Sequence, residues 1–346
     1  MDYRHIPIMN DVRMKEVLYI SNYRKGVGGI SAQVDLFRRH VRAEGYEATI
    51  FSTKGNPIKR IWRFVRLMFV ARKYDVLHIH GCSDWGMVPV VYGVIAGKIW
   101  RKRIIVTYHG GEAAGYFAKH RAFARRWLKR ADKVIVLSGF LKNVFDEYQI
   151  PCAVIPNIVT LRENIYQQKK SIVPKFISVR HLTKLYQIDL IIRAFEEVQK
   201  RYPNATLDIL GQGNKRKELE LYVNEHQLNG IRFIGQVPNE KIYDYLRAND
   251  IMLSAPKIDN MPVSLLEAMN AGVLVISSNV GGVPYIIEHE RTGLLFESGN
   301  VDALADQMEW VLTHQAESLH MISVAHEEVK KYSWTNIREQ VLPLYE

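Results

Sequence analysis

The sequence predicts an α/β protein made of two domains, each with a parallel β-sheet that helices cover on both faces. At 346 residues, the chain is longer than one hydrophobic core usually organises. Short apolar runs of strand length alternate with amphipathic helical stretches, a pattern typical of parallel sheets. A polar, unpatterned stretch at 160–174 separates two such series, and it predicts a linker between the domains.

The first series follows residues 1–15, which we expect to form a loose leader. Its predicted strands are 16–23, 48–51, 75–81, 103–108 and 133–137, and its predicted helices are 30–44, 58–73, 119–133 and 139–147. Glycines at 26, 28 and 29 follow the first strand and allow close approach of a ligand to the backbone. They are not a dinucleotide fingerprint, because Ser31 stands where the third glycine belongs and no acidic residue ends the second strand. A nicotinamide-dependent dehydrogenase is therefore not expected.

The second series is organised around the stretch 249–287. A strand at 251–254 leads through a polar loop to Pro262, which we expect at the first helical position, and Gly272 is placed to end that helix. Further strands are predicted at 175–179, 206–210, 233–238 and 273–276, and further helices at 188–201, from 301 and from 333. The helix after Pro262 begins at the carboxyl edge of the sheet, where its free N–H groups could bind a diphosphate.

Two carboxylates accompany that helix. Asp259 precedes it and Glu267 lies on it, and such a pair can accept hydrogen bonds from vicinal hydroxyls of a sugar and a ribose. The alternative is that Asp259 only caps the helix and that Glu267 is solvated.

The stretch resembles the carboxy-terminal signature of the family 4 retaining glycosyltransferases. The matching residues are Asp259, Glu267-Ala268-Met269 and Gly281-Gly282-Val283-Pro284. The resemblance implies a GT-B fold, in which two Rossmann-like domains face each other across a cleft and a C-terminal helix crosses back to the first domain. It assigns residues 1–160 to an acceptor-binding domain, 170–332 to a nucleotide-sugar-binding domain and 333–346 to the crossing helix. Many members have Glu at the place of Asp259.

The resemblance also assigns roles to single residues. It implies that Asp259, Arg180 and His109 are catalytic, and that Gly28 and Gly29 form an acceptor or diphosphate loop. The donor-binding residues that it implies are Glu267, Lys184, Asn260, Met261, Pro262, Val263, Ser264, Gly211 and Val237. The family usually has a lysine followed by glycine where this chain has Leu185 or Tyr186, and Lys184 is the nearest substitute. His80, which also ends a strand, is expected to be structural.

Positive charge is concentrated in the first half. Residues 1–165 contain 28 Lys and Arg against 13 Asp and Glu, whereas residues 166–346 contain 19 against 23. The basic amphipathic helix at 58–73 and the basic stretch at 119–133 could dock on anionic lipid. The alternative for 58–73 is an ordinary helix that covers the sheet and exposes a solvated basic face. Neither segment has the aromatic pattern of a nucleic-acid-binding surface, and no nucleic-acid partner is expected.

The predicted function is transfer of a sugar, with retention of configuration, from a nucleotide-sugar to a hydroxyl of a glycan or lipid-linked acceptor, as in surface polysaccharide biosynthesis. The nucleotide-sugar is a co-substrate, and neither a cofactor nor a metal is expected. Cys82 and Cys152 indicate no disulfide framework, and no uncharged run is long enough to span a bilayer, so we expect a cytoplasmic protein that can associate with the inner membrane face. Two alternatives stay open: a nucleotide-sugar epimerase and a non-catalytic protein that binds sugar nucleotides.

Overall fold

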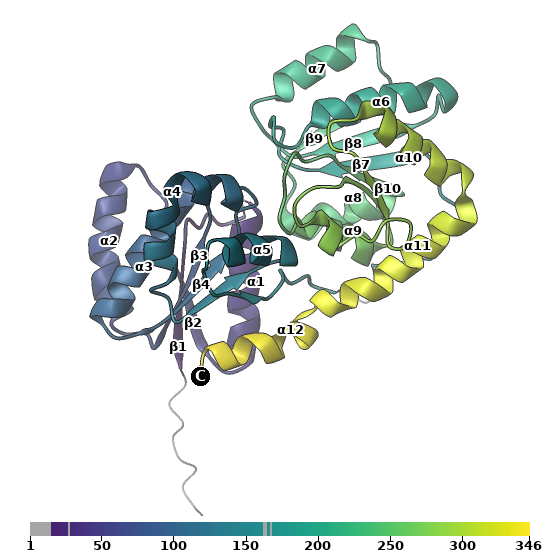
Figure 1. The fold of residues 1–346 in the computed structure, drawn as a ribbon. Helices are drawn as coiled ribbons and strands as arrows, with labels where there is room; N and C mark the ends of the chain where they lie inside the picture. The colour runs from purple at the N-terminus through teal and green to yellow at the C-terminus, as the bar shows by residue number, and fades with distance from the viewer. Residues whose placement is uncertain (1–14, 27, 162–164, 167) are drawn as a thin grey trace, which may run out of the picture.

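The computed structural model describes residues 15–26, 28–161, 165–166 and 168–346. The expected leader, apart from Lys15, and residues 162–164 and 167 of the expected linker lie outside the described residues. The described residues form two parallel sheets of six strands each. Figure 1 shows them as two halves that lie side by side. The predicted fold class is confirmed.

The first sheet has the strand order β2-β1-β3-β4-β5-β6. Its strands are β1 (Glu16–Ser21), β2 (Glu47–Ser52), β3 (Val76–Gly81), β4 (Arg103–Tyr108), β5 (Lys133–Val136) and β6 (Ala153–Val154). Its helices are α1 (Gly29–Ala43), α2 (Pro57–Ala71), η1 (Asp84–Gly86), α3 (Met87–Ile99), α4 (Ala113–Leu128) and α5 (Gly139–Glu147). The hydrophobic core on one face of this sheet includes residues of α2 to α5, and α1 packs on the other face. Both faces are therefore buried, as the continuous apolar strands require.

The second sheet has the order β12-β11-β10-β7-β8-β9. Its strands are β7 (Lys175–Val179), β8 (Thr206–Leu210), β9 (Ile231–Gly235), β10 (Ile251–Ser254), β11 (Leu274–Ser278) and β12 (Leu294–Phe296). Its helices are α6 (Ile188–Arg201), α7 (Arg216–Glu225), η2 (Asn239–Lys241), α8 (Ile242–Ala248), α9 (Val263–Ala271), η3 (Val283–Tyr285), α10 (Val301–Thr313), α11 (Gln315–Glu328) and η4 (Val329–Tyr332). All pairings in both sheets are parallel, so the carboxyl ends of the strands within each sheet share one edge.

The C-terminal segment returns to the first half through α12 (Trp334–Val341) and the short η5 (Leu342–Leu344) (Figure 1). Trp334 stacks on His40 with ring centroids 5.1 Å apart, and its indole N–H donates to Glu44 at 2.8 Å. Tyr345 is 1% exposed, and its hydroxyl lies 2.9 Å from the hydroxyl of Tyr19 in β1. Residues from the end of the chain thus complete the core of the first half.

Two predicted helix positions are wrong in detail. The basic stretch at 119–133 is not one helix: α4 begins at Ala113 and ends at Leu128, because tighter hydrogen bonds from Arg130 and Ala131 close its last turn. Lys133 instead begins β5. Pro262 has an extended ψ of 112° and precedes α9, so Val263 is the first helical residue. Gly272 ends α9 in the left-handed conformation, as predicted.

Helix α2 buries only a narrow strip of its surface. Leu67 and Ala71 are buried, whereas the apolar side chains of Ile61, Trp62 and Phe69 are each more than 60% exposed. Helix α2 thus covers the first half through this strip and exposes basic side chains, as the alternative expects, and its solvent side also carries these apolar side chains. Across the described part of the chain, no helix combines the length and apolarity needed to cross a bilayer.

Candidate active site

A cleft of about 580 Å³ lies between the two halves. The first half lines it with the loops that follow β1, β3 and β4, and the second half with the loops that follow β7, β8, β9 and β10. Ligands of parallel α/β sheets bind at this edge, where the strands end and helices begin. The two sheets thus direct their ligand-binding edges toward one shared cavity.

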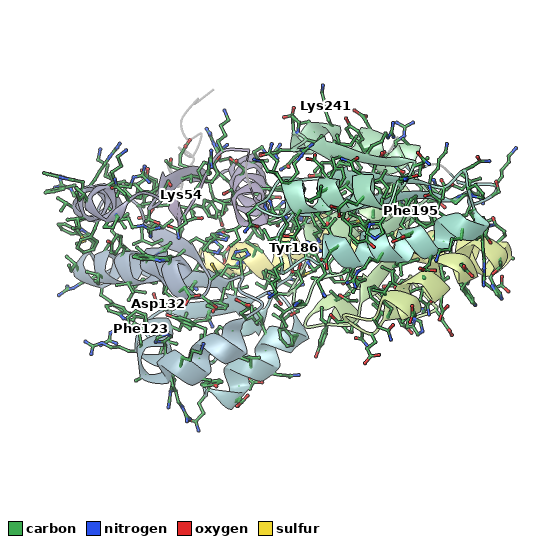
Figure 2. The ribbon with its side chains drawn as sticks, turned by 90° about the horizontal axis from the view of Figure 1, so that it is seen from above. Lys54, Phe123, Asp132, Tyr186, Phe195 and Lys241 are labelled. Carbon is green, nitrogen blue, oxygen red and sulfur yellow. The ribbon has the colours of Figure 1, made fainter. Side chains whose placement is uncertain are left out.

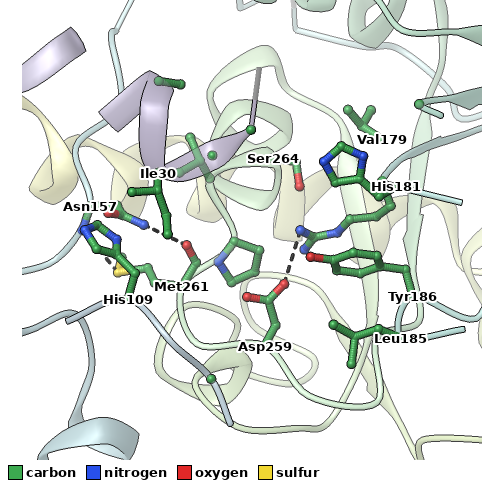
Figure 3. Close-up of a pocket in the computed structure, with 18 of the residues that line it drawn as sticks. Ile30, His109, Asn157, Val179, His181, Leu185, Tyr186, Asp259, Met261 and Ser264 are labelled. Atoms are coloured by element: carbon green, nitrogen blue, oxygen red, sulfur yellow. Dashed lines mark hydrogen bonds and ion pairs between the residues drawn. The ribbon is translucent and has the colours of Figure 1, made fainter. Parts of the chain in front are cut away.

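Arg180 and Asp259 form an ion pair on the second half's side of the cleft. Arg180 Nη1 lies 3.2 Å from Asp259 Oδ2, and the two side chains are 10% and 18% exposed. Arg180 Nε also lies 3.4 Å from the hydroxyl of Ser254, and the guanidinium is 5.3 Å from the ring centroid of Tyr186. Figure 3 shows the ion pair as a dashed line beside Tyr186. Among the described residues, one carboxylate, one hydroxyl and one ring hold this cation, and a phosphate could replace the carboxylate.

The loop that carries Arg180 is supported by a glycine turn after β8. Gly211 has φ +134°, and a Cβ there would lie 1.9 Å from the carbonyl oxygen of Arg180. A Cβ at Gly213 would lie 2.0 Å from the carbonyl oxygen of Leu182. Only glycine permits this approach, so both glycines fix the position of Arg180. Gly213 therefore has a packing function in this turn.

The N-terminus of α9 faces the cleft through Pro262, Val263 and Ser264. Among the described residues, no side chain caps this terminus. Asp259 does not cap it, because one of its oxygens accepts the backbone N–H of Asn260 at 2.7 Å and the other pairs with Arg180. Within the part of the chain that the structure describes, the hydroxyl of Ser264 is buried and has no hydrogen-bond partner. The site therefore offers a helix terminus and a hydroxyl to an anionic ligand.

His109 approaches the cleft from the first half, directly after β4. Its Nε2 lies 2.8 Å from Nδ1 of His80, which is 2% exposed. Burial lowers the pKa of His109 to about 3, so the imidazole is neutral at pH 7. In Figure 3, His109 and Asn157 lie on one side of the pocket, and Asp259 and Tyr186 lie on the other.

The structure brings most of the predicted site residues to the cleft. Those that line it are Asp259, Arg180, His109, Glu267, Met261, Pro262, Val263, Ser264, Gly211, Val237, Gly28 and Gly29. Gly28 precedes α1 with φ +83°, a conformation that favours glycine.

Two predicted donor-binding residues do not line the cleft. A turn closed by the N–H of Tyr186 and the carbonyl of Thr183 leaves Lys184 exposed and places Tyr186 in the cleft lining. Asn260 is 2% exposed and accepts a 2.5 Å hydrogen bond from Ser138 of the first half. Asn260 therefore joins the two halves. In the view of Figure 2, Tyr186 lies near the place where the halves meet.

Asn157 is a residue of this region to which the sequence assigned no site role. Its amide donates to the carbonyl oxygen of Met261 at 2.9 Å, and its backbone N–H lies 3.3 Å from the sulfur of Met261. It thereby fixes the loop before α9 against the first half. The Pro-Asn pair after β6 was the available signal, but a contact between the halves cannot be read from one segment.

The described residues contain no group of three or more His, Cys, Asp or Glu side chains that could hold a metal ion.

Two protein-family models match parts of the chain. The family model "Glycosyl transferases group 1" matches residues 163–328, and the model "Glycosyltransferase Family 4" matches residues 54–163. The chain belongs to the group 1, family 4 glycosyltransferases. The two models meet at the connection between the sheets, so the family covers both sides of the cleft.

Individual relatives are distant. The chain is 28% identical over 199 residues to the gpi3 subunit of phosphatidylinositol N-acetylglucosaminyltransferase from Schizosaccharomyces pombe, a match that covers 56% of this chain and 43% of that subunit. It is 29% identical over 302 residues to the uncharacterised glycosyltransferase MJ1607 of Methanocaldococcus jannaschii, covering 79% of this chain and 75% of the relative. The crystal structure of Anabaena HepE with UDP and glucose matches with a TM-score of 0.78 at 17% identity, covering 95% of this chain and 98% of that one. That likeness shows a shared GT-B fold.

Proposed function

We propose that the chain transfers a sugar from a nucleotide-sugar donor to a hydroxyl acceptor, with retention of configuration and without a metal. The observation that carries the proposal is the Arg180–Asp259 pair at the uncapped N-terminus of α9, facing His109 across the cleft. The pair joins a cation suited to a diphosphate with an oxygen acceptor suited to sugar hydroxyls.

In the proposed complex, the donor diphosphate lies between Arg180 and the first N–H groups of α9. The phosphate takes the place of Asp259 at the guanidinium, and Asp259 then accepts hydroxyls of the sugar. As the glycosidic bond breaks, negative charge grows on the leaving diphosphate, and these fixed donors stabilise it. A leaving phosphate oxygen accepts the proton of the incoming hydroxyl. Glu267, which also lines the cleft, binds the ribose.

A thermal-shift screen with UDP-, GDP-, ADP- and dTDP-sugars tests donor binding. A donor at 100 times its dissociation constant should stabilise the protein by about 2.7 kcal/mol. We expect one nucleotide class to act on wild type and to lose its effect in Glu267→Ala. The matched control is Glu225→Ala, an exposed residue at the end of α7.

Product analysis with the same donors separates the reaction classes. Sugar transferred with its anomeric configuration unchanged supports the proposal. An isomerised donor without transfer identifies an epimerase, and donor binding without hydrolysis or transfer in any acceptor mixture identifies a binding protein. UDP-sugars are the first donors to examine, because the structure of HepE contains UDP and glucose.

The first half is proposed to bind the acceptor, and α2 supports a lipid-linked acceptor at an anionic membrane surface. Ile58, Ile61, Trp62 and Phe69 on α2 are 62–70% exposed, and Lys59 and Arg66 are exposed beside them in sequence. Such a face inserts apolar side chains at the lipid boundary while its cations meet lipid headgroups. Helix α4 presents a second set of exposed cations: Lys119, Arg121 and Arg126. The proposal therefore includes docking on the inner membrane face and a role in surface polysaccharide biosynthesis. The relative gpi3, a subunit of an enzyme named for phosphatidylinositol, supports a lipid-linked acceptor.

Vesicle co-sedimentation tests this docking face. We expect wild type to bind vesicles with 30% phosphatidylglycerol more strongly than pure phosphatidylcholine vesicles, and added salt to weaken the binding. Replacing Trp62 and Phe69 together by serine should lower binding by about tenfold or more, because burying each ring contributes roughly 1 kcal/mol or more. Leu221→Ser, which changes a 56% exposed side chain on α7, is the matched control. Equal binding to both vesicle types, or full binding by the double variant, would contradict the proposal.

A further inference from the structure

Three histidines form a row beneath the first half's side of the cleft. The rings of His78 and His80 in β3 are stacked with centroids 4.6 Å apart, and those of His80 and His109 are 5.1 Å apart. His78 and His80 are 1% and 2% exposed, and only His109 is among the residues that line the cleft. Burial keeps the pKa of each imidazole below its ordinary value, so all three are neutral at pH 7.

Hydrogen bonds divide this row into two separate units. The two ring nitrogens of His78 lie 2.7 Å from the hydroxyl of Tyr345 and 2.8 Å from the hydroxyl of Thr107. His78 therefore has no nitrogen left for His80. His80 Nδ1 lies 2.8 Å from His109 Nε2, and His80 Nε2 is buried without any partner in the described structure.

The positions of the protons follow from this pairing. A neutral imidazole has one N–H donor and one acceptor nitrogen. Because His80 Nδ1 and His109 Nε2 lie 2.8 Å apart, one of them donates a hydrogen and the other accepts it. If His109 donated it, the N–H of His80 would be its Nε2–H, buried and without an acceptor. If His80 donates it, only a lone pair of His80 Nε2 stays unused. Buried unpaired N–H groups are the rarer case, so donation by His80 is favoured.

We propose that His80 is a positioning residue that donates Nδ1–H to Nε2 of His109 and thereby fixes His109 as the tautomer with its proton on Nδ1. His109 then offers an N–H donor to a hydroxyl or phosphate oxygen of the ligand. The contact between this N–H group and a ligand rests on the proposed function, whereas the tautomer is a property of the ligand-free protein. A neutral N–H donor adds a directed hydrogen bond without repelling Arg180 across the cleft.

Long-range ¹H–¹⁵N correlation spectra of ¹⁵N-histidine-labelled protein test the tautomer directly. We expect His109 in the ligand-free wild type to carry its proton on Nδ1. His80→Phe removes the partner and should abolish this preference, and kcat/KM for transfer should fall about 10- to 100-fold, the effect of one lost hydrogen bond in the site. His80→Asn places an amide near the former Nδ1 and should restore the tautomer and at least part of kcat/KM.

Tyr345→Phe is the matched control, because it removes the hydroxyl that His78 and Tyr19 contact and leaves the His80–His109 pair intact. It should lower the Tm and leave both the tautomer of His109 and kcat/KM within about twofold of wild type. A wild-type His109 protonated on Nε2, an unchanged tautomer in His80→Phe, or equal effects in Tyr345→Phe would overturn the proposal. If the protein turns over no nucleotide-sugar, the spectra still test the proposed role of His80. Failure of this role is therefore distinguishable from failure of the proposed function.

Discussion

Replacing Arg180 by alanine is expected to lower kcat/KM by about 10²- to 10³-fold, the typical cost of removing one charge-stabilising donor from a closed site. Arg180 is the cation that the structure places in contact with Asp259 and Tyr186 inside the cleft. Its loss removes both the diphosphate partner and the group that positions Asp259. Steady-state kinetics with the donor identified by thermal shift measures the effect.

Two companion variants make this result specific. Arg180→Lys retains the charge but not the two-pronged geometry, so it should recover only part of the activity. Lys184→Ala removes an exposed cation four positions away that does not line the cleft, and its kcat/KM should stay within about twofold of wild type. A folded Arg180→Ala protein with wild-type kcat/KM would exclude the proposed site, as would a larger loss in Lys184→Ala than in Arg180→Ala.

Mild acid is expected to destabilise the protein strongly. Burial lowers the pKa of His78 and of His109 to about 3, while an unfolded histidine titrates near 6.5. Below pH 6.5 the unfolded state therefore binds protons that the folded state does not, and stability falls until the folded pKa is reached. Between pH 7.5 and 5.0, each of these two residues should lower the free energy of unfolding by about 2 kcal/mol. His80 should lower it further, because its pKa is also lowered.

Urea unfolding at pH 7.5, 6.5, 5.5 and 5.0 measures this slope. His78→Asn should flatten it, because one buried titrating group is removed, even if the variant is less stable at every pH. His226→Asn, at an exposed position after α7, should leave the slope unchanged. A free energy of unfolding that stays constant from pH 7.5 to 5.0 would show that the three imidazoles are not held neutral.

The parts of the site that follow local rules could be predicted from the sequence. Arg180 and His109 each come directly after an apolar run, and in a parallel sheet the ends of such runs converge at one edge. The helix after Asp259 was visible from its apolar spacing and from the glycine that ends it. Periodicity and turn chemistry act over a few residues, so a single sequence contains them.

The features that were missed depend on contacts between distant segments. Asn260 looked like a ligand residue, but Ser138 of the other half engages it. Lys184 looked near enough to the donor, but the direction of one turn excludes it from the cleft. The exposure of Trp62 depends on how little of α2 the sheet covers. No local pattern contains this information, because each case is decided by a surface formed elsewhere in the chain.

The return of the C-terminal segment has a consequence for biosynthesis. Tyr19 and Phe37 leave the ribosome about 300 residues before Trp334 and Tyr345, which cover them in the folded protein. Part of the apolar surface of the first half therefore stays exposed until the second half has been synthesised. Such long-range closure slows folding and prolongs the exposure of that surface to other chains. Assembly of the two halves is thus a late step, which covers the remaining apolar surface of the first half and forms the cleft.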